Sequence, residues 1–190
     1  MPRAGLSPDV VVAEAARFVD DEGAHKLTLA ALAKRFGVAL PSLYKHVAGL
    51  DDLHGRLATT AASELAVELR RAATGRAGRE ALRAVASAYR TYASDHPGRY
   101  QYLLRAHPGD EAYEAAAGEV LDVVYGVFAG YAIEGEDAVD AARFVRSTLH
   151  GFVALEAVRG FGIPRSVDRS FDRLVDGLDR ALVGWSPSAG

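Results

Sequence analysis

The sequence predicts an all-α protein of about nine helices. Apolar residues recur at intervals of three and four, as on one face of a helix, and no segment alternates like a half-buried strand. Glycines, prolines and capping residues divide these segments into pieces of ordinary helix length. The chain has 190 residues, of which 49% are hydrophobic and 25% charged, so its composition is that of a globular protein with a sizeable core.

The first helix is expected over residues 8–22. Ser7 is a suitable N-cap, and Pro8 in the first turn lacks only an N–H that the helix would not use. Gly23 ends the helix. The buried face consists of residues at helical spacing, namely Val12, Ala15, Ala16 and Val19.

Residues 28–46 have the spacing of a helix-turn-helix. Thr28 can cap a short helix, and Gly37 permits the positive φ with which such a helix ends sharply. A second short helix begins near Leu40, with Pro41 in its first turn. The apolar face of the first short helix is formed by Leu29, Leu32, Ala33 and Phe36.

The second short helix has one face free of core residues. Leu43 and Val47, four residues apart, are expected to pack back onto the first helix. Ser42, Lys45 and His46 then lie outside, on a surface that could enter a major groove.

The charge pattern favours the same function. No Asp or Glu lies between residues 23 and 50, whereas all three lysines of the chain and one arginine do, namely Lys26, Lys34, Arg35 and Lys45. The net charge is -3, which excludes a general binder of polyanions. A local positive face on an acidic protein suits phosphate contacts with DNA, and the alternative is an ordinary solvated surface.

Six further helices are expected, over residues 51–73, 81–94, 99–105, 111–131, 137–159 and 167–183. Asp51 and Asp52 favour the start of the first of them, because negative charge stabilises a helix N-terminus. We therefore predict a three-helix head at residues 1–50, a helical-bundle body at 51–185 and a tail at 186–190.

Two groups of residues resemble the tetracycline-repressor (TetR) family of transcriptional regulators. In the head they are Ala15, Ala16, Gly23, Leu27, Thr28, Leu32, Ala33, Gly37, Val38, Leu43, Tyr44, His46 and Leu53. In the body they are Tyr89, His96, Pro97, Gly98, Tyr100 and residues 149–156, which resemble the body type known for a Trp-His-Gly (WHG) motif. Two positions depart from the family: Leu50 replaces a lysine that commonly contacts phosphate, and Leu149 replaces the tryptophan of the motif.

The resemblance implies a helix-turn-helix DNA-binding head with contacts from Thr28, Leu40, Pro41, Ser42, Tyr44, Lys45 and His46. Thr28 and Tyr44 would bind phosphates, and Lys45 would read a guanine. Leu40 and Pro41 would meet thymine methyl groups. Structural roles remain open beside these: N-capping for Thr28, core packing for Tyr44, and turn geometry for Leu40 and Pro41.

In the body, the resemblance implies a pocket for a small, mostly apolar or aromatic effector. The candidate lining residues are Tyr89, Tyr92, Tyr100, Tyr102, Tyr125, Phe128, His150 and Phe152. The alternative is that these residues fill the core. The last two long helices are expected to form a homodimer interface, unless their stripes only close the chain's own core. The candidates there are Phe144, Thr148, Gly151, Leu155, Phe171, Leu174, Leu178 and Leu182.

These observations predict a repressor that binds a pseudo-palindromic double-stranded DNA operator as a homodimer and is released by the effector. No HExxH, GxxxxGK or nucleophile-elbow motif occurs, so we expect neither an enzyme nor a cofactor or metal. The alternative is a helical adaptor whose head does not bind DNA. The chain lacks cysteine, an apolar signal core and a membrane-spanning run, so we expect a cytoplasmic protein. The effector, the operator and the choice between repression and activation stay open.

Overall fold

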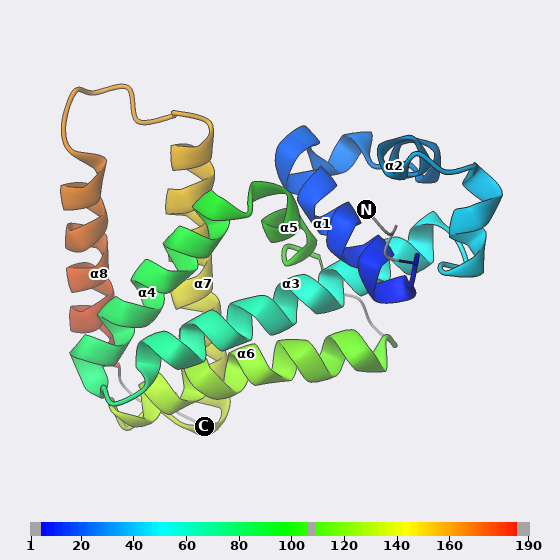
Figure 1. Cartoon of the computed structure of the whole chain (residues 1–190). Helices are drawn as coiled ribbons and strands as arrows, with labels where there is room; N and C mark the ends of the chain where they lie inside the picture. The colour runs from blue at the N-terminus through cyan, green and yellow to red at the C-terminus, as the bar shows by residue number, and fades with distance from the viewer. Residues whose placement is uncertain (1–4, 106–108, 186–190) are drawn as a thin grey trace. The chain divides into compact units, whose positions relative to one another are not determined.

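The computed structural model describes residues 5–105 and 109–185, and every regular element in them is helical (Figure 1). These ranges contain eight α-helices and two short 3₁₀ helices. No β-strand occurs in the described residues, and the predicted all-α fold is confirmed. The expected tail at residues 186–190 lies outside them.

The chain forms two compact units. Unit 1 comprises the described residues of Met1–Glu64 and Asp95–Ala117, and unit 2 comprises those of Leu65–Ser94 and Gly118–Gly190. The long helices α3 (Leu50–Ala73) and α6 (Glu111–Ala129) contribute residues to both units. Unit 1 therefore holds not only the helices predicted for the head but also α5 (Pro97–Tyr102) and the beginning of α6.

The helices at the start of unit 1 follow the capping signals of the sequence. α1 (Pro8–Glu22) begins after Ser7, whose hydroxyl accepts a hydrogen bond from the backbone N–H of Val10 at 3.2 Å. It ends at Gly23, which has φ 96° and leads into η1 (Ala24–Lys26). α2 (Leu29–Phe36) and η2 (Leu40–Lys45) follow, as the helix-turn-helix spacing predicts.

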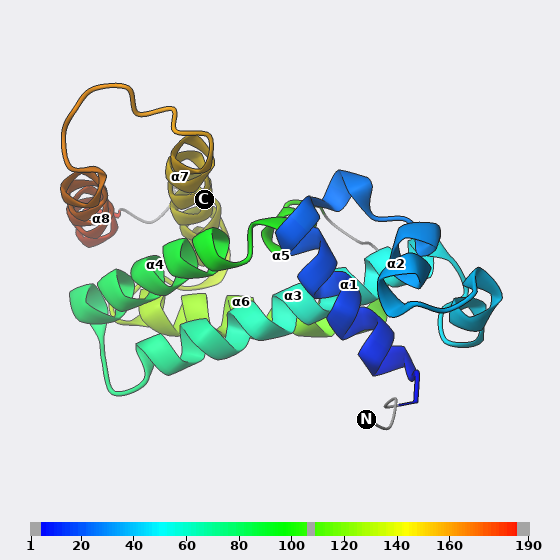
Figure 2. The ribbon, with the colours of Figure 1, turned by 45° about the horizontal axis from the view of Figure 1, so that its top comes forward.

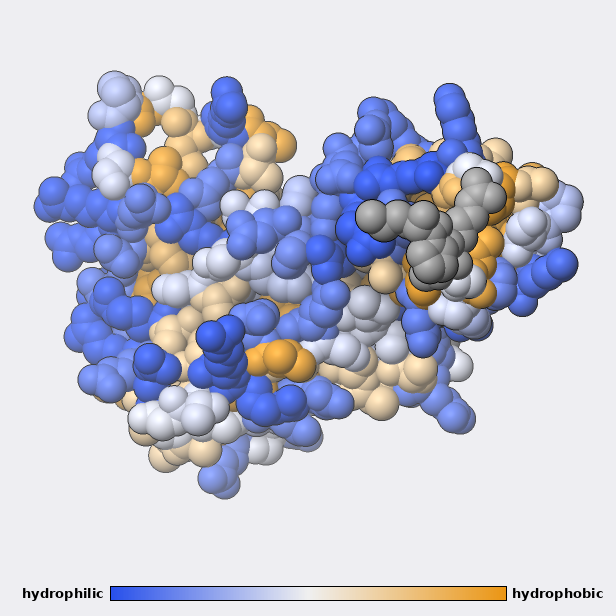
Figure 3. All heavy atoms as spheres, viewed as in Figure 1, coloured by the Kyte–Doolittle hydropathy of each residue, from blue (hydrophilic) through white to orange (hydrophobic). Residues whose placement is uncertain are grey.

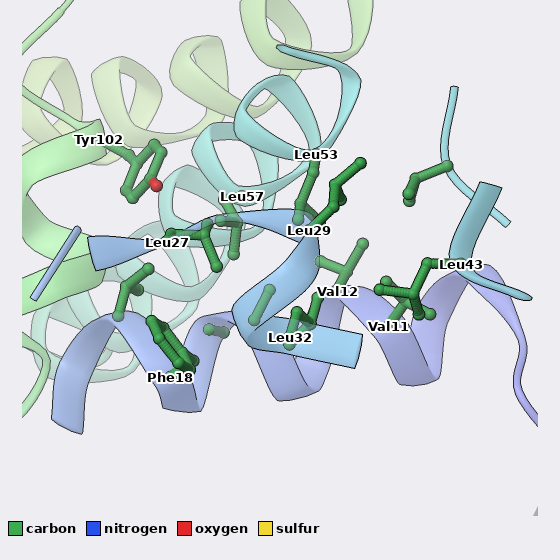
Figure 4. Packing of buried hydrophobic residues seen from close by; sticks show 14 of the residues in the cluster. Val11, Val12, Phe18, Leu27, Leu29, Leu32, Leu43, Leu53, Leu57 and Tyr102 are labelled. Atoms are coloured by element: carbon green, nitrogen blue, oxygen red, sulfur yellow. The ribbon is translucent and has the colours of Figure 1, made fainter. Parts of the chain in front are cut away.

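An apolar core joins the elements of unit 1 (Figure 4). Leu32 of α2, Leu43 of η2 and Leu53 of α3 are fully buried in it. The far side of this core is closed by Tyr102 of α5, which lies near Leu57 of α3 (Figure 4). Burial of leucines from three elements fixes the helix-turn-helix against α3, because each would lose about 1.5–3 kcal/mol if exposed.

Unit 2 contains α4 (Gly78–Asp95) except its last residue, α7 (Gly135–Ala157) and α8 (Val167–Val183), with the end of α3 and most of α6. α7 and α8 lie side by side (Figures 1 and 2). Arginines of α4 bind carboxylates of the last two helices. Arg83 contacts Asp176 of α8 at 2.5 Å, and Arg90 contacts Glu156 of α7 at 2.5 Å and Asp168 of α8 at 2.8 Å. α4 begins three residues earlier than the sequence pattern indicates, and α8 has the predicted bounds.

Polar side chains cover most of the face shown in Figure 3. Apolar side chains reach the surface around the connection between α7 and α8, where Val158 and Ile163 are largely exposed (Figure 3). Among the helices of the described ranges, none combines the length and apolarity that a membrane crossing requires.

Candidate nucleic-acid interface

The turn between α2 and η2 has the geometry that the sequence predicts. The hydroxyl of Thr28 accepts a hydrogen bond from the Ala31 N–H at 3.0 Å and so caps α2. Gly37 ends α2 in the left-handed conformation with φ 68°, and the Val38 N–H donates to the carbonyl of Ala33 at 3.0 Å. This closing pattern is a Schellman motif, and it directs the chain abruptly into η2.

One side of η2 is buried against the core of unit 1, and the other side is exposed to solvent. Leu43 is fully buried and points toward Val11 of α1, and Val47 just beyond η2 is buried as well (Figure 4). The exposed face carries Tyr44, with 55% of its surface accessible, and Lys45. Tyr44 is therefore not a core residue.

The other predicted contacts lie on or beside the same short helix. Leu40 and Pro41 at its start are exposed, and Ser42 and His46 are half-buried. Thr28 at the N-terminus of α2 is exposed, and its hydroxyl also serves the capping role described above. The surface formed by these seven residues combines a cation, hydroxyl groups and apolar side chains, which are the groups that contact phosphates, base edges and thymine methyls.

The positive charge of this region is partly neutralised inside unit 1. Arg35 binds Glu14 at 2.5 Å and Asp21 at 2.7 Å, both on α1, and its guanidinium lies 5.6 Å from the ring centre of Phe18. The hydrogen bonds that Arg35 donates to Asp21 and Glu14 raise its pKa. Lys26 pairs with the Glu22 carboxylate at 3.1 Å.

Lys34 and Lys45 have no ion pair among the described residues. The local sequence pattern does not distinguish these two cations from the paired ones, because the partners of Arg35 lie 14 and 21 residues away in the chain. The excess of acidic residues on α1 indicates that some cations of this region are paired, but it does not identify which lysine or arginine those acids bind.

The start of α3 is held by a carboxylate in its own first turn. Asp52 accepts hydrogen bonds from the Ala48 N–H at 2.8 Å and from Arg56 Nε at 2.8 Å. Burial raises the pKa of Asp52, but these bonds outweigh it and hold the pKa below its ordinary value. Leu50 packs against the core of unit 1, so its side chain supports the head through apolar contact.

The aromatic residues predicted for the effector pocket fall into both units. Tyr100 and Tyr102 belong to unit 1, whereas the other six belong to unit 2. The Tyr102 hydroxyl lies 2.9 Å from His54 Nδ1, and burial raises the pKa of Tyr102 to about 12. Phe128 is fully buried, and the ring of Phe152 packs against the rings of Phe161 and Phe171.

The structure also contains an open groove of about 870 Å³ in unit 1, lined by residues of α1, α3 and the start of α6 and by Arg99 of α5. None of the eight predicted pocket residues lines this groove, whose walls include Asp9, Thr60 and Asp110.

The predicted interface residues also differ in exposure. On α7, Phe144 and Leu155 are 37% and 49% exposed, Gly151 is exposed and Thr148 is half-buried. On α8, Leu174 is half-buried, whereas three residues are at most 4% exposed within the single chain, namely Phe171, Leu178 and Leu182. Those three side chains close the core of unit 2.

Comparison with known proteins identifies the family. A family model described as "Tetracyclin repressor-like, C-terminal domain" matches residues 82–178. The HTH-type transcriptional regulator Rv0681 of Mycobacterium tuberculosis is 41% identical over 155 residues, which cover 80% of this chain and 71% of the relative. The HTH-type transcriptional regulator YobS of Bacillus subtilis is 36% identical over 163 residues, 84% of each chain.

Solved structures have the same fold. A protein of unknown function from Rhodococcus sp. RHA1 matches with a TM-score of 0.79 and 25% identity, over 96% of this chain and 99% of the other. BioQ, crystallised with its natural double-stranded DNA operator, matches with a TM-score of 0.63 and 24% identity, over 92% of this chain and 98% of BioQ. The curated relatives are transcriptional regulators and not enzymes. With its helix-turn-helix in unit 1 and a repressor-like C-terminal domain, this chain belongs to the TetR family of DNA-binding transcriptional regulators.

Proposed function

We propose that the protein is a repressor that binds a pseudo-palindromic operator as a homodimer, in the cytoplasm, and leaves it when a small, mostly apolar or aromatic effector binds the body. The observation that carries the proposal is η2, whose buried Leu43 holds an exposed face with Tyr44 and Lys45. A short helix anchored in this way can insert into a major groove and present several side chains to base edges. BioQ, which shares the fold, is described with its DNA operator bound.

In this proposal the seven surface residues divide their roles. Lys45 donates to guanine O6 and N7, and Leu40 and Pro41 contact thymine methyls. Thr28 and Tyr44 bind phosphates and set the register of the head on the duplex. Ser42 contacts a base, and His46 contacts the DNA backbone.

A homodimer is proposed because one short helix contacts too few base pairs for useful specificity. The exposed face of α7, with Phe144, Gly151 and Leu155, offers a surface for an isologous contact with a second copy. α8 supports this surface from within the chain, because Leu178 and Leu182 are buried. Two heads then bind half-sites one helical turn, or a multiple of it, apart.

The effector site is proposed for the aromatic residues of unit 2, with hydroxyl groups and His150 orienting the ligand. Binding releases the operator only if the ligand prefers the DNA-free state. The operator must then weaken ligand affinity by the same factor, which calorimetry with and without DNA measures.

Selection from a random duplex library tests DNA recognition directly. The wild-type protein should enrich one pseudo-palindrome, and Lys45→Ala should lose about 1–3 kcal/mol on it and relax one base position. Lys34→Ala is the matched control, because Lys34 is also exposed and without an ion pair among the described residues but lies outside η2. A wild-type protein that enriches no sequence would refute the proposal and favour the adaptor function.

A further inference from the structure

α5 is tied to the DNA-binding unit by a carboxylate of α1. Asp20 Oδ1 accepts hydrogen bonds from the backbone N–H groups of Gly98 and Arg99 at 3.1 and 2.9 Å. The side chain of His96, at the N-cap position of α5, makes no capping hydrogen bond. The cap of α5 is therefore supplied by a helix 78 residues earlier in the chain.

The guanidinium of Arg99 extends this link to a third helix. Its Nε donates to Asp20 Oδ2 at 2.7 Å, and its Nη1 donates to the Glu64 carboxylate of α3 at 2.7 Å. The side chains of Arg99 and Asp20 are only 14% and 13% exposed, so water screens this pair weakly. One arginine thus joins α5, α1 and α3 inside unit 1.

The same part of α1 also holds the helix-turn-helix. Asp21, next to Asp20, binds Arg35 of α2 at 2.7 Å, and Glu14 one to two turns earlier binds the same guanidinium. Adjacent carboxylates of α1 are therefore bound by arginines of two different elements, Arg99 of α5 and Arg35 of α2. α5 and α1 approach so closely that a Cβ on Gly98 would lie 2.0 Å from the Val19 carbonyl oxygen.

Apolar burial and these charged contacts differ in how strongly they specify the direction of a helix in the head. Burial of Val11, Val12 and Val19 attaches α1 to the core, but the hydrophobic effect itself is non-directional, so apolar burial specifies the angle of α1 less sharply than directed hydrogen bonds do. Arginine–carboxylate hydrogen bonds have a fixed planar geometry, so they specify direction as well as distance. The end of α1 is thus held by directed hydrogen bonds that Arg99 donates to Asp20.

We propose that Arg99 is a positioning residue for operator recognition, which fixes the angle of α1, and through Arg35 that of α2 and η2, without touching DNA. The proposal rests on the proposed operator-binding function. Base-edge contacts require side chains placed within a fraction of an ångström, whereas phosphate contacts are made by flexible charged side chains and tolerate small rotations. Loss of Arg99 should therefore weaken binding to operator far more than binding to unrelated DNA.

The test compares Arg99→Gln with wild type on two duplexes: the palindrome that wild type selects from a random library, and a scrambled duplex of equal length. Operator affinity should fall about tenfold per head, hence about a hundredfold for two heads, while affinity for scrambled DNA should change less than about threefold. Arg99→Lys should recover part of the lost operator affinity, because an ammonium group keeps the positive charge but not the planar set of donors with which a guanidinium binds two carboxylates. Arg70→Gln is the control, since Arg70 pairs two helices, α3 and α6, at 3.0 Å through Glu119 in unit 2.

Hydrogen exchange on the DNA-free full-length protein gives a second, independent readout. Arg99→Gln should speed exchange at the end of α1 and in α2 and leave α7 and α8 unchanged, with the head still folded. The proposal would be overturned if Arg99→Gln exchanged at the same rates as wild type, or if its affinity fell equally on both duplexes. Asp20→Asn removes the carboxylate partner of Arg99 and serves as a second variant. Unfolding of unit 1 in both variants would also overturn the proposal. If wild type selects no palindrome, the proposed function fails, and the exchange comparison alone then decides whether Arg99 positions the head.

Discussion

Replacing Gly98 with alanine should destabilise unit 1 strongly. The new Cβ would lie 2.0 Å from the Val19 carbonyl oxygen, 2.2 Å from its carbon and 2.6 Å from the Asp20 nitrogen. Ordinary contact between such atoms is about 3.5 Å, so α5 and α1 must separate by roughly 1 Å or more. All three obstructing atoms belong to backbone, which leaves no side-chain rotation that relieves the contact.

The expected magnitude follows from what this separation breaks. Overpacking of this kind costs about 1–3 kcal/mol. The two hydrogen bonds that Asp20 accepts, at 3.1 and 2.9 Å, would lengthen beyond bonding range, and bonds to a charged group contribute about 1.5–3 kcal/mol each. With partial relaxation, we expect a loss of about 3–6 kcal/mol in the free energy of unfolding, a large part of the stability of an ordinary domain.

Urea unfolding followed by circular dichroism, at one fixed protein concentration, measures this loss. Gly126→Ala is the matched control, because Gly126 lies in α6 and a Cβ added there would have no atom within 4 Å. Replacing a helical glycine with alanine stabilises a helix by up to about 1 kcal/mol. Equal urea midpoints for Gly98→Ala and Gly126→Ala would show that α1 and α5 are not in close contact, and would refute the reasoning.

Substitutions at four further positions have distinct expected outcomes. Burial lowers the pKa of His54, so the unfolded chain takes up a proton at a higher pH than the folded protein does. The free energy of unfolding should therefore decline as the pH falls below about 6.5. His54→Gln should flatten that decline in unfolding curves recorded from about pH 8 to about 5. Thr28→Ala should lose about 1 kcal/mol of stability through the missing cap, while Thr28→Ser, which keeps a hydroxyl, should unfold like wild type. Leu155→Glu should give a folded monomer by light scattering, because Leu155 is half exposed on α7, and a persistent dimer would exclude this face as the interface. Leu178→Glu should unfold unit 2 instead, because it places a charge in the core.

Local signals in the sequence were sufficient for the order of the helices and for several of their ends, whereas the bounds of α4, α5 and α7 differ from the predicted ones by up to three residues. Capping by Ser7 and Thr28 and the left-handed Gly37 depend on residues within a few positions, so the turn of the helix-turn-helix and the exposed face of η2 follow from short-range pattern. The same holds for the bounds of α8, where Ser166 caps the helix and the apolar stripe has helical spacing.

The sequence pattern could not specify what the apolar and charged faces of these helices contact. The stripe on α8 shows that Phe171 and Leu182 are buried, but periodicity cannot tell a core in the same chain from an interface with a second one. In the same way, the spacing of aromatic residues does not reveal that Tyr102 packs with the head whereas Phe152 packs on α8. Arg35 is a further example, since its charge is compensated across 14 to 21 residues of chain.

The division of the chain into units has a consequence for synthesis and for engineering. Unit 1 is built from Met1–Glu64 and Asp95–Ala117, so its packing cannot be completed on the ribosome until residue 117 has been translated and released from the exit tunnel. For the interval in which only the first 64 residues are available, the apolar surface that α5 covers is open to chaperones. A chimera that exchanges heads between relatives at residue 50 would separate Asp20 from its native Arg99, and a graft that carries residues 95–117 along with the first 64 would keep them together.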